Sequence, residues 1–420
     1  MKKNPREKGD KTKLKALDWA KIEPSKILNT IWEKDMDETE IEFDEINFKE
    51  EFCLKPTVAK SSKSSVSSST KKKKKCYCES DQQRNITIVL NTIIKKLKDK
   101  NEKSGTSERE KEEKLVKLIN SLVEELEDCG MSEPKILTPD NISLLIPILP
   151  TEAVFNKVSK ESAVLETEDD YDPADLFIIY IGVIIGYKER LQSLLFLSEY
   201  KVMIQNLEIF IGFFNKGFDF VLKSQNLKRL FEIMLAIGNY MNGITVRGGA
   251  FGFQLDSINK FIELKSKDNK TNLLDYIVEF IYEDINNRLL IDNLLENFKN
   301  FKSMEINSIN ELMNDLNKKF KNFTTLKEKV EAHKKELEED DNVEKFLDKY
   351  YKLIENEIAK IKTKVDKIQT DFSKVIKFLG EDKYDIEKFI KLFKDFYDEL
   401  KKSNDLYREK KNKKNKLGKI

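Results

Sequence analysis

The chain has 420 residues with only 14 glycines and 8 prolines, a composition that favours long helices over many short strands. Its 76 Lys and Arg balance 75 Asp and Glu, so no global field draws the protein to nucleic acid or to a membrane. Four cysteines and one histidine exclude a typical disulfide framework, and they suggest the reducing environment of the cytoplasm.

Both tryptophans, Trp19 and Trp32, lie in a short opening segment on either side of Pro24. A segment of this length has no core of its own, so both indole rings must be buried elsewhere. The residues alone leave open whether they dock on the chain's own body or on another chain.

Residues 55–80 begin with a Ser- and Lys-rich run that cannot form a packed core. We therefore predict a flexible spacer, with polyanion binding by Lys71–Lys75 as the alternative. Cys76 and Cys78 are one residue closer than the usual C-x-x-C pair, so we predict no metal site and no cofactor.

A helical region is predicted over 81–175, beginning with an Asn and alternating apolar residues that include Ile88. An Ile at this position could be a core residue or an exposed contact, because the two look identical in sequence. The polar stretch that follows is predicted to be an insertion over about 98–130.

Region 176–300 opens with an apolar stretch from Leu176 to Tyr187, which is too short to span a membrane and predicts a buried core helix. A second helix is predicted from the three- and four-residue spacing of Leu227, Leu230, Phe231, Met234, Ile237 and Met241. It runs into a glycine-rich loop that keeps two aromatic residues, Phe251 and Phe253. This loop is either a plain cap and turn or a binding element; no strand precedes it and no Gly-Lys-Ser/Thr follows, which excludes a phosphate loop.

Region 301–400 contains a heptad pattern, which predicts a coiled-coil seam that pairs two chains or packs within one chain. The pattern comprises Leu347, Tyr351, Ile354, Ile358, Ile361, Val365, Ile368, Phe372, Val375 and Leu379. Residues 401–420 form a basic tail. The only histidine, His333, lies on a charged helix, and no catalytic constellation is visible, so we predict that the protein is not an enzyme.

The strings GNYMN at 238–242 and RGGAFGF at 247–253, together with the two-tryptophan opening, resemble the signature of the formin homology 2 domain. The resemblance implies an all-α, elongated helical subunit that forms a head-to-tail ring homodimer. Its regions would be a lasso (14–54), a linker (55–80), a knob (81–175), a post with core helices (176–300), a coiled coil with closing helices (301–400) and a tail (401–420).

The same resemblance implies an actin-binding module that nucleates filaments and stays processively bound at the barbed end during elongation. It implies actin contacts at Ile88, Lys260 and Lys265. It implies dimerisation residues Trp19, Trp32, Gly238, Asn239, Tyr240, Met241, Asn242, Gly249, Phe251, Gly252 and Phe253. Profilin would be reached only through a proline-rich region that is not present in this chain. A coiled-coil scaffold and a basic microtubule- or nucleic-acid-binding protein are the alternatives.

Overall fold

A computed structural model describes Trp19, Ile22, Ile27, Thr30 and Trp32, and then residues 76–97, 108–162 and 171–417. Most of the predicted lasso and linker therefore lies outside the described residues. In the described part the elements are helices, with a single isolated bridge between Lys265 and Asn272, which confirms the all-α prediction. None of the described helices is both long and apolar enough to cross a membrane.

The chain divides into two compact units that do not follow the sequential regions. Unit 1 draws on Met1–Ala59, Leu207–Asn310 and Lys362–Ile420, and unit 2 on Lys60–Asn206 and Glu311–Ile361. The divisions fall inside three long helices, α7 (Tyr187–Lys223), α12 (Ile306–Ala332) and α13 (Val343–Phe378). The regions predicted at 176–300 and 301–400 therefore each contribute to both units.

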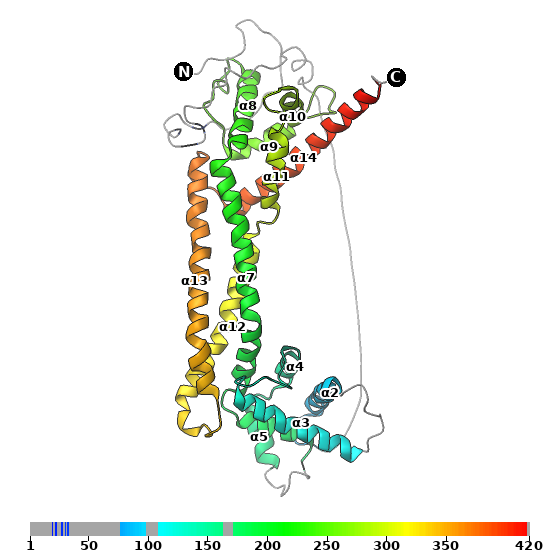
Figure 1. Cartoon of the computed structure of the whole chain (residues 1–420), viewed down its shortest axis with the longest axis vertical. Coiled ribbons are helices and arrows are strands. Elements are labelled where there is room, and N and C mark those ends of the chain that lie inside the picture. Colours follow the sequence, from blue (N-terminus) through cyan, green and yellow to red (C-terminus); the bar gives the residue numbers. More distant parts are fainter. Residues whose placement is uncertain are drawn as a thin grey trace. The chain divides into compact units, whose positions relative to one another are not determined.

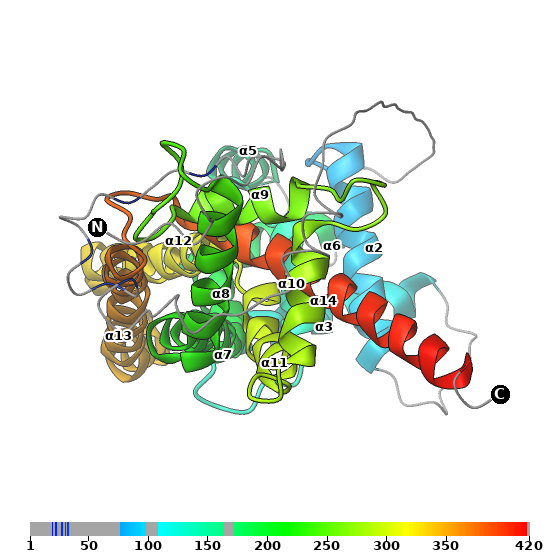
Figure 2. The same cartoon turned by 90° about the horizontal axis from the view of Figure 1, so that it is seen from above.

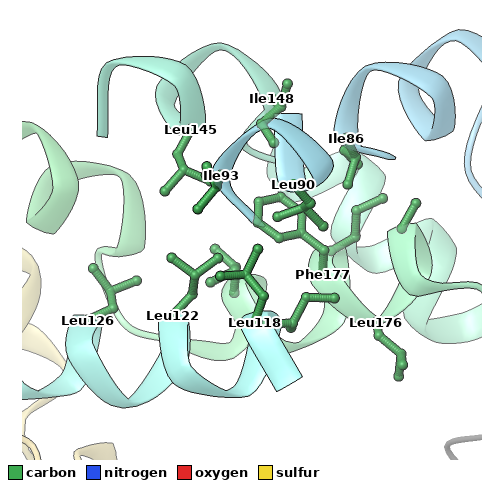
Figure 3. Close-up of a cluster of buried hydrophobic side chains, with 14 of the residues drawn as sticks. Ile86, Leu90, Ile93, Leu118, Leu122, Leu126, Leu145, Ile148, Leu176 and Phe177 are labelled. Atoms are coloured by element: carbon green, nitrogen blue, oxygen red, sulfur yellow. The ribbon is translucent and has the colours of Figure 1, made fainter. Parts of the chain in front are cut away.

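Five helices build the main core of unit 2 (Figure 1). They are α2 (Ser80–Leu97), α3 (Glu108–Asp128), α4 (Pro139–Leu145), α5 (Glu152–Ser162) and α6 (Pro173–Val183). Ile148 of the 3-10 turn η3 (Ile146–Ile148) and Leu191, near the start of the next helix, join this core, and a second 3-10 turn, η6 (Lys334–Glu336), lies elsewhere in the unit. Figure 3 shows Leu90 and Ile93 of α2 facing the leucines of α3 across Phe177 of α6. The apolar stretch predicted from Leu176 to Tyr187 is thus a buried core helix only in its first part, because α6 ends at the exposed Val183 and α7 begins at Tyr187.

The polar insertion predicted over about 98–130 is corrected by α3. Its start is rich in Glu and Lys, but Leu118, Leu122 and Leu126 are almost fully buried in the core of unit 2 (Figure 3). These leucines repeat every four residues and place one apolar stripe on the helix. Residues 108–128 therefore belong to the core, and only 98–107 lie outside the described residues.

Unit 1 contains α8 (Gln225–Asn242), the turn η5 (Leu255–Ser257), α9 (Ile258–Glu263), α10 (Leu273–Glu283), α11 (Leu290–Lys302) and α14 (Ile386–Leu417). Helices α10 and α14 lie side by side in both views (Figures 1 and 2). Phenylalanine rings join α11 to α14, with Phe301 stacked on Phe393 at a centroid distance of 4.8 Å. This aromatic contact holds the long C-terminal helix on the rest of the unit.

Nine of the ten heptad residues lie on α13 and Leu379 follows its end; the apolar face of the helix packs against the same chain. In unit 2 the Tyr351 ring lies 5.4 Å from Phe320, and in unit 1 the Phe372 ring lies 5.2 Å from Phe389. Eight of the ten predicted seam residues are buried, and Tyr351 and Val365 are half-buried. Of the two arrangements left open by the sequence, intramolecular packing is therefore the one that forms.

Candidate functional site

The GNYMN string is the last turn and a half of α8, and it is buried on all sides. Every residue from Leu230 to Asn242 is buried, whereas the spacing alone predicted one buried face. Ser224 caps the start of the helix by accepting a hydrogen bond from the Leu227 amide, and Gly243 ends it with a φ of +55°. A helix covered all round has partners on more than one side.

Asn239 attaches the glycine-rich loop to this helix. The Ala250 amide donates to Asn239 Oδ1 at 2.7 Å, and Asn239 Nδ2 donates to the Ala250 carbonyl oxygen at 2.9 Å. Asn239 and Ala250 are both buried, so breaking this reciprocal pair of hydrogen bonds would leave buried polar groups without partners and lower stability. It places Gly252 and Phe253 directly beside α8.

Trp19 lies on the end of α8 and against this loop. Its indole stacks on the Phe253 ring at 5.7 Å with an interplanar angle of 12°, and its Nε1 donates to the Arg247 carbonyl oxygen at 3.1 Å. A Cβ atom on Gly238 would lie 2.1 Å from Trp19 Cζ3, so only glycine leaves room for the ring. Gly238, the first residue of GNYMN, thus lies directly against the Trp19 ring.

Trp32 occupies the adjoining space. Its ring stacks on Phe231 at 5.7 Å and meets Phe253 edge-on at 4.7 Å, while its Nε1 donates to the Leu379 carbonyl oxygen at 3.2 Å. A Cβ atom on Gly252 would lie 2.8 Å from the indole. We call the surface that receives both rings the tryptophan pocket; it is lined by Phe231, Gly238, Gly252, Phe253, Phe261 and Gly380.

Gly380, which follows α13, is a wall of the pocket that the sequence did not indicate. Its φ of +82° favours glycine, and a Cβ atom there would lie 2.5 Å from Ile22 Cδ1. Glu381 fixes this turn by accepting a hydrogen bond from the Leu255 amide at 2.6 Å. Burial raises the pKa of the Glu381 carboxyl above its usual range, and the Leu255 hydrogen bond opposes that shift.

The remaining predicted dimerisation residues lie in the end of α8 and in the glycine-rich loop. Tyr240, Met241 and Asn242 are buried within the helix end, Gly249 has a φ of +62°, and Phe251 is half-buried. The pocket residues that the sequence did not single out are Phe231, Phe261 and Gly380. The helical spacing indicated that Phe231 is buried, whereas no local sequence pattern indicated that Gly380 lies near Trp32.

Gly238→Ala is expected to displace Trp19 while the helices stay folded, at a cost of about 1 to 3 kcal/mol for overpacking. The tryptophan emission should shift to longer wavelength as the indole meets water. Gly212→Ala is the matched control, because Gly212 also lies in a helix and a Cβ atom there meets nothing within 4 Å. That control should keep the wild-type emission and gain up to about 1 kcal/mol of stability from helix propensity. An unchanged emission spectrum for Gly238→Ala would contradict the pocket.

Ile88 lies on α2 in unit 2, and its side chain faces solvent. The residue is 52% exposed, whereas Ile86 and Leu90 on the same helix are fully buried. The core alternative left open by the sequence is therefore wrong for Ile88. An exposed Ile on a rigid helix can serve as an apolar contact for a partner.

The two predicted lysines lie in unit 1, which also contains the tryptophan pocket. Lys260 is on α9, one residue before the pocket residue Phe261, and its ammonium pairs with Glu263 at 2.8 Å. Lys265 is exposed and follows α9, where it forms the isolated bridge with Asn272. Lys260 and Lys265 therefore lie in unit 1, as the pocket does, and Ile88 lies in unit 2.

The sequence matches known proteins over nearly its whole length. The formin homology 2 domain family matches residues 4–401. The chain is 27% identical to Formin-G of Dictyostelium discoideum over 376 residues, which are 88% of this chain and 32% of that protein. It is 26% identical to Formin-A of the same organism over 66% of this chain and 23% of that protein. It is also 25% identical to Protein diaphanous of Drosophila melanogaster over 67% of this chain and 26% of that protein.

The chain thus spans about a quarter to a third of the length of these relatives. The match covers both compact units and includes the two tryptophans, α8 and the glycine-rich loop. The chain belongs to the formin homology 2 domain family.

Proposed function

We propose that this protein binds actin, nucleates filaments and stays bound at the barbed end while subunits add. Membership of the formin homology 2 family supports the proposal. The observation that carries it is the tryptophan pocket, because the family's GNYMN and GGAFGF residues build it and both tryptophans fill it. The protein acts by binding, without catalysis, in the cytoplasm on the actin cytoskeleton.

The working form is a head-to-tail homodimer in which each chain's tryptophans fill the other's pocket. Two identical chains carry identical pockets, so an indole makes the same contacts whether the pocket belongs to its own chain or to a second copy. Exchange of the opening segment between two copies therefore closes a ring without any new interface. The stacked rings and the indole hydrogen bonds described above would be retained.

Each subunit offers actin an apolar and a basic contact. Ile88 presents an exposed apolar side chain, and the basic contacts are the exposed Lys265 and Lys260, whose ammonium pairs with Glu263 in the free chain. Apolar contacts supply most of the affinity, and charges steer the encounter with an acidic surface. Profilin would be engaged only through a proline-rich region that this chain does not contain.

A structural coiled-coil scaffold is less well supported, because the heptad face of α13 is already covered by the chain's own aromatic residues. Assembly of pyrene-labelled actin tests the proposal directly. Addition of the purified protein should shorten the lag before filaments form. It should also slow the loss of subunits from barbed ends on dilution. An unchanged lag together with unchanged depolymerisation would overturn the proposed function.

Ile88→Ala is expected to weaken actin assembly by about 2 kcal/mol of binding free energy with little change in the melting temperature. Ile86→Ala is the matched control, since Ile86 lies on the same helix and is fully buried. That variant should cost about 2 to 5 kcal/mol of stability. Assembly rate and thermal melting are measured on both. Full assembly activity in Ile88→Ala would show that this side chain is not an actin contact.

A further inference from the structure

Two cysteines and a buried aspartate meet at the start of unit 2, outside the surfaces described above. Cys76 and Cys78 precede α2, and Asp175 lies in the first turn of α6. Cys76 Sγ lies 3.1 Å from Cys78 Sγ and donates to Asp175 Oδ1 at 3.0 Å. The two sulfur atoms and a carboxylate oxygen all lie within 4.8 Å of one another.

The carboxylate is held in place by the backbone of the cysteine segment. The Tyr77 amide donates to Asp175 Oδ2 at 2.9 Å, and the Cys78 amide donates to Asp175 Oδ1 at 3.1 Å. Asp175 is only 1% exposed, so its orientation is set by these contacts. Metal-binding carboxylates are commonly oriented by hydrogen bonds of this kind from an outer shell.

A second carboxylate, that of Asp172, caps the start of α6 three residues before Asp175. Asp172 is buried, and its carboxylate accepts hydrogen bonds from the Ala174 amide at 2.9 Å and from the side-chain amide of Gln83 at 2.8 Å. Two thiols and a buried carboxylate therefore share a space in which a further negative charge is costly. A bound cation removes that cost, because it stabilises thiolates directly.

We propose that Cys76 Sγ, Cys78 Sγ and a carboxylate oxygen of Asp175 bind a thiophilic divalent cation of the size of Zn²⁺. Tetrahedral Zn²⁺ needs sulfur atoms about 3.8 Å apart and sulfur–oxygen distances of about 3.5 Å. The two sulfur atoms therefore separate by about 0.7 Å, and Cys76 Sγ and Asp175 Oδ1 separate by about 0.5 Å. Both thiol protons pass to solvent as the two metal–sulfur bonds form. The half-buried side of Cys76 leaves the fourth position to water.

Such a site would tie the start of α2 to α6 across almost one hundred residues of sequence. The C-x-C pair has too few ligands by itself, and the third donor comes from a helix that follows much later in the chain. Because thiols must lose their protons to bind, metal affinity should fall as the pH is lowered.

The test is Zn²⁺ and Co²⁺ titration of metal-stripped protein kept reduced with a phosphine. The wild type should bind one ion per chain, with Co²⁺ giving thiolate charge-transfer absorption, and Zn²⁺ should raise the melting temperature. Cys76→Ser should weaken Zn²⁺ binding by more than the roughly 10- to 100-fold that loss of an outer-shell partner costs. Cys129→Ala is the control, because Cys129 is buried elsewhere and should not affect binding.

Asp175→Asn distinguishes the three-donor site from a simple dithiol. It keeps an acceptor for the backbone amides and removes the charge, and it should also weaken Zn²⁺ binding. Folding of each variant is checked by circular dichroism without metal. The proposal is overturned if the wild type binds no Zn²⁺, if the Cys76→Ser, Cys78→Ser double variant binds it as well as the wild type, or if Asp175→Asn leaves affinity unchanged.

Discussion

A chain carrying both Trp19→Ala and Trp32→Ala is expected to sediment as a monomer while its helical circular dichroism stays nearly unchanged. Each indole is almost fully buried, stacked on a phenylalanine and hydrogen-bonded through its Nε1. Truncating a large buried aromatic side chain costs about 3 to 5 kcal/mol. Loss of both rings therefore removes enough free energy to dissociate a dimer that depends on them. A double variant that stays dimeric would contradict the assignment.

A mixing experiment shows whether the rings dock within one chain or between two. The partner for the tryptophan-free chain carries Gly238→Ala and Gly252→Ala, which block its own pocket and leave its tryptophans intact. On mixing, these tryptophans can enter only the open pocket of the tryptophan-free chain. Their emission should then shift to shorter wavelength and a dimer should appear. No shift on mixing would mean that docking between chains does not occur.

Asp341→Asn is expected to lower stability by about 3 to 5 kcal/mol, because it leaves the charge of Arg190 buried and unpaired. The guanidinium of Arg190 has no exposed surface and bonds both oxygens of Asp341, at 2.7 and 2.5 Å. It also donates to the carbonyl oxygens of Ile185 and Leu126. This one side chain thus joins three segments of unit 2.

Thermal melting checks this prediction. A domain of this size loses roughly 2 to 4 °C per kcal/mol, so a fall of about 6 to 20 °C is expected. Glu208→Gln is the control, since it removes a carboxylate from an exposed pair with Lys364. Exposed pairs contribute about 0 to 1 kcal/mol. Equal effects of the two substitutions would show that burial of the Arg190 pair is unimportant.

The sequence by itself determined the features that depend on local pattern. Apolar spacing located α8 and the seam of α13, because one face of a helix repeats every three to four residues. The segment that holds Trp19 and Trp32 is too short to form a core of its own, so both rings had to be buried elsewhere. The GNYMN and GGAFGF strings, together with the two tryptophans, were specific enough to indicate the family.

The helix α3 shows where the sequence pattern was misleading. Its Glu- and Lys-rich start suggested an insertion, although Leu118 and Leu122 carried the helical spacing. Composition averaged over a stretch conceals a narrow apolar stripe, because a helix needs only one face to join a core. A count of spacing within 108–128 would have found it.

Only the tertiary structure decided which surfaces meet. It exposed Ile88 and buried Ile86, it covered the heptad face with the chain's own aromatic rings, and it set Gly380 against the opening segment. It also brought Asp175 to Cys76 and Cys78, whose spacing alone predicted no metal site. Sequence periodicity shows which face of a helix is apolar, whereas the residues that face it are set by packing between segments far apart in the chain.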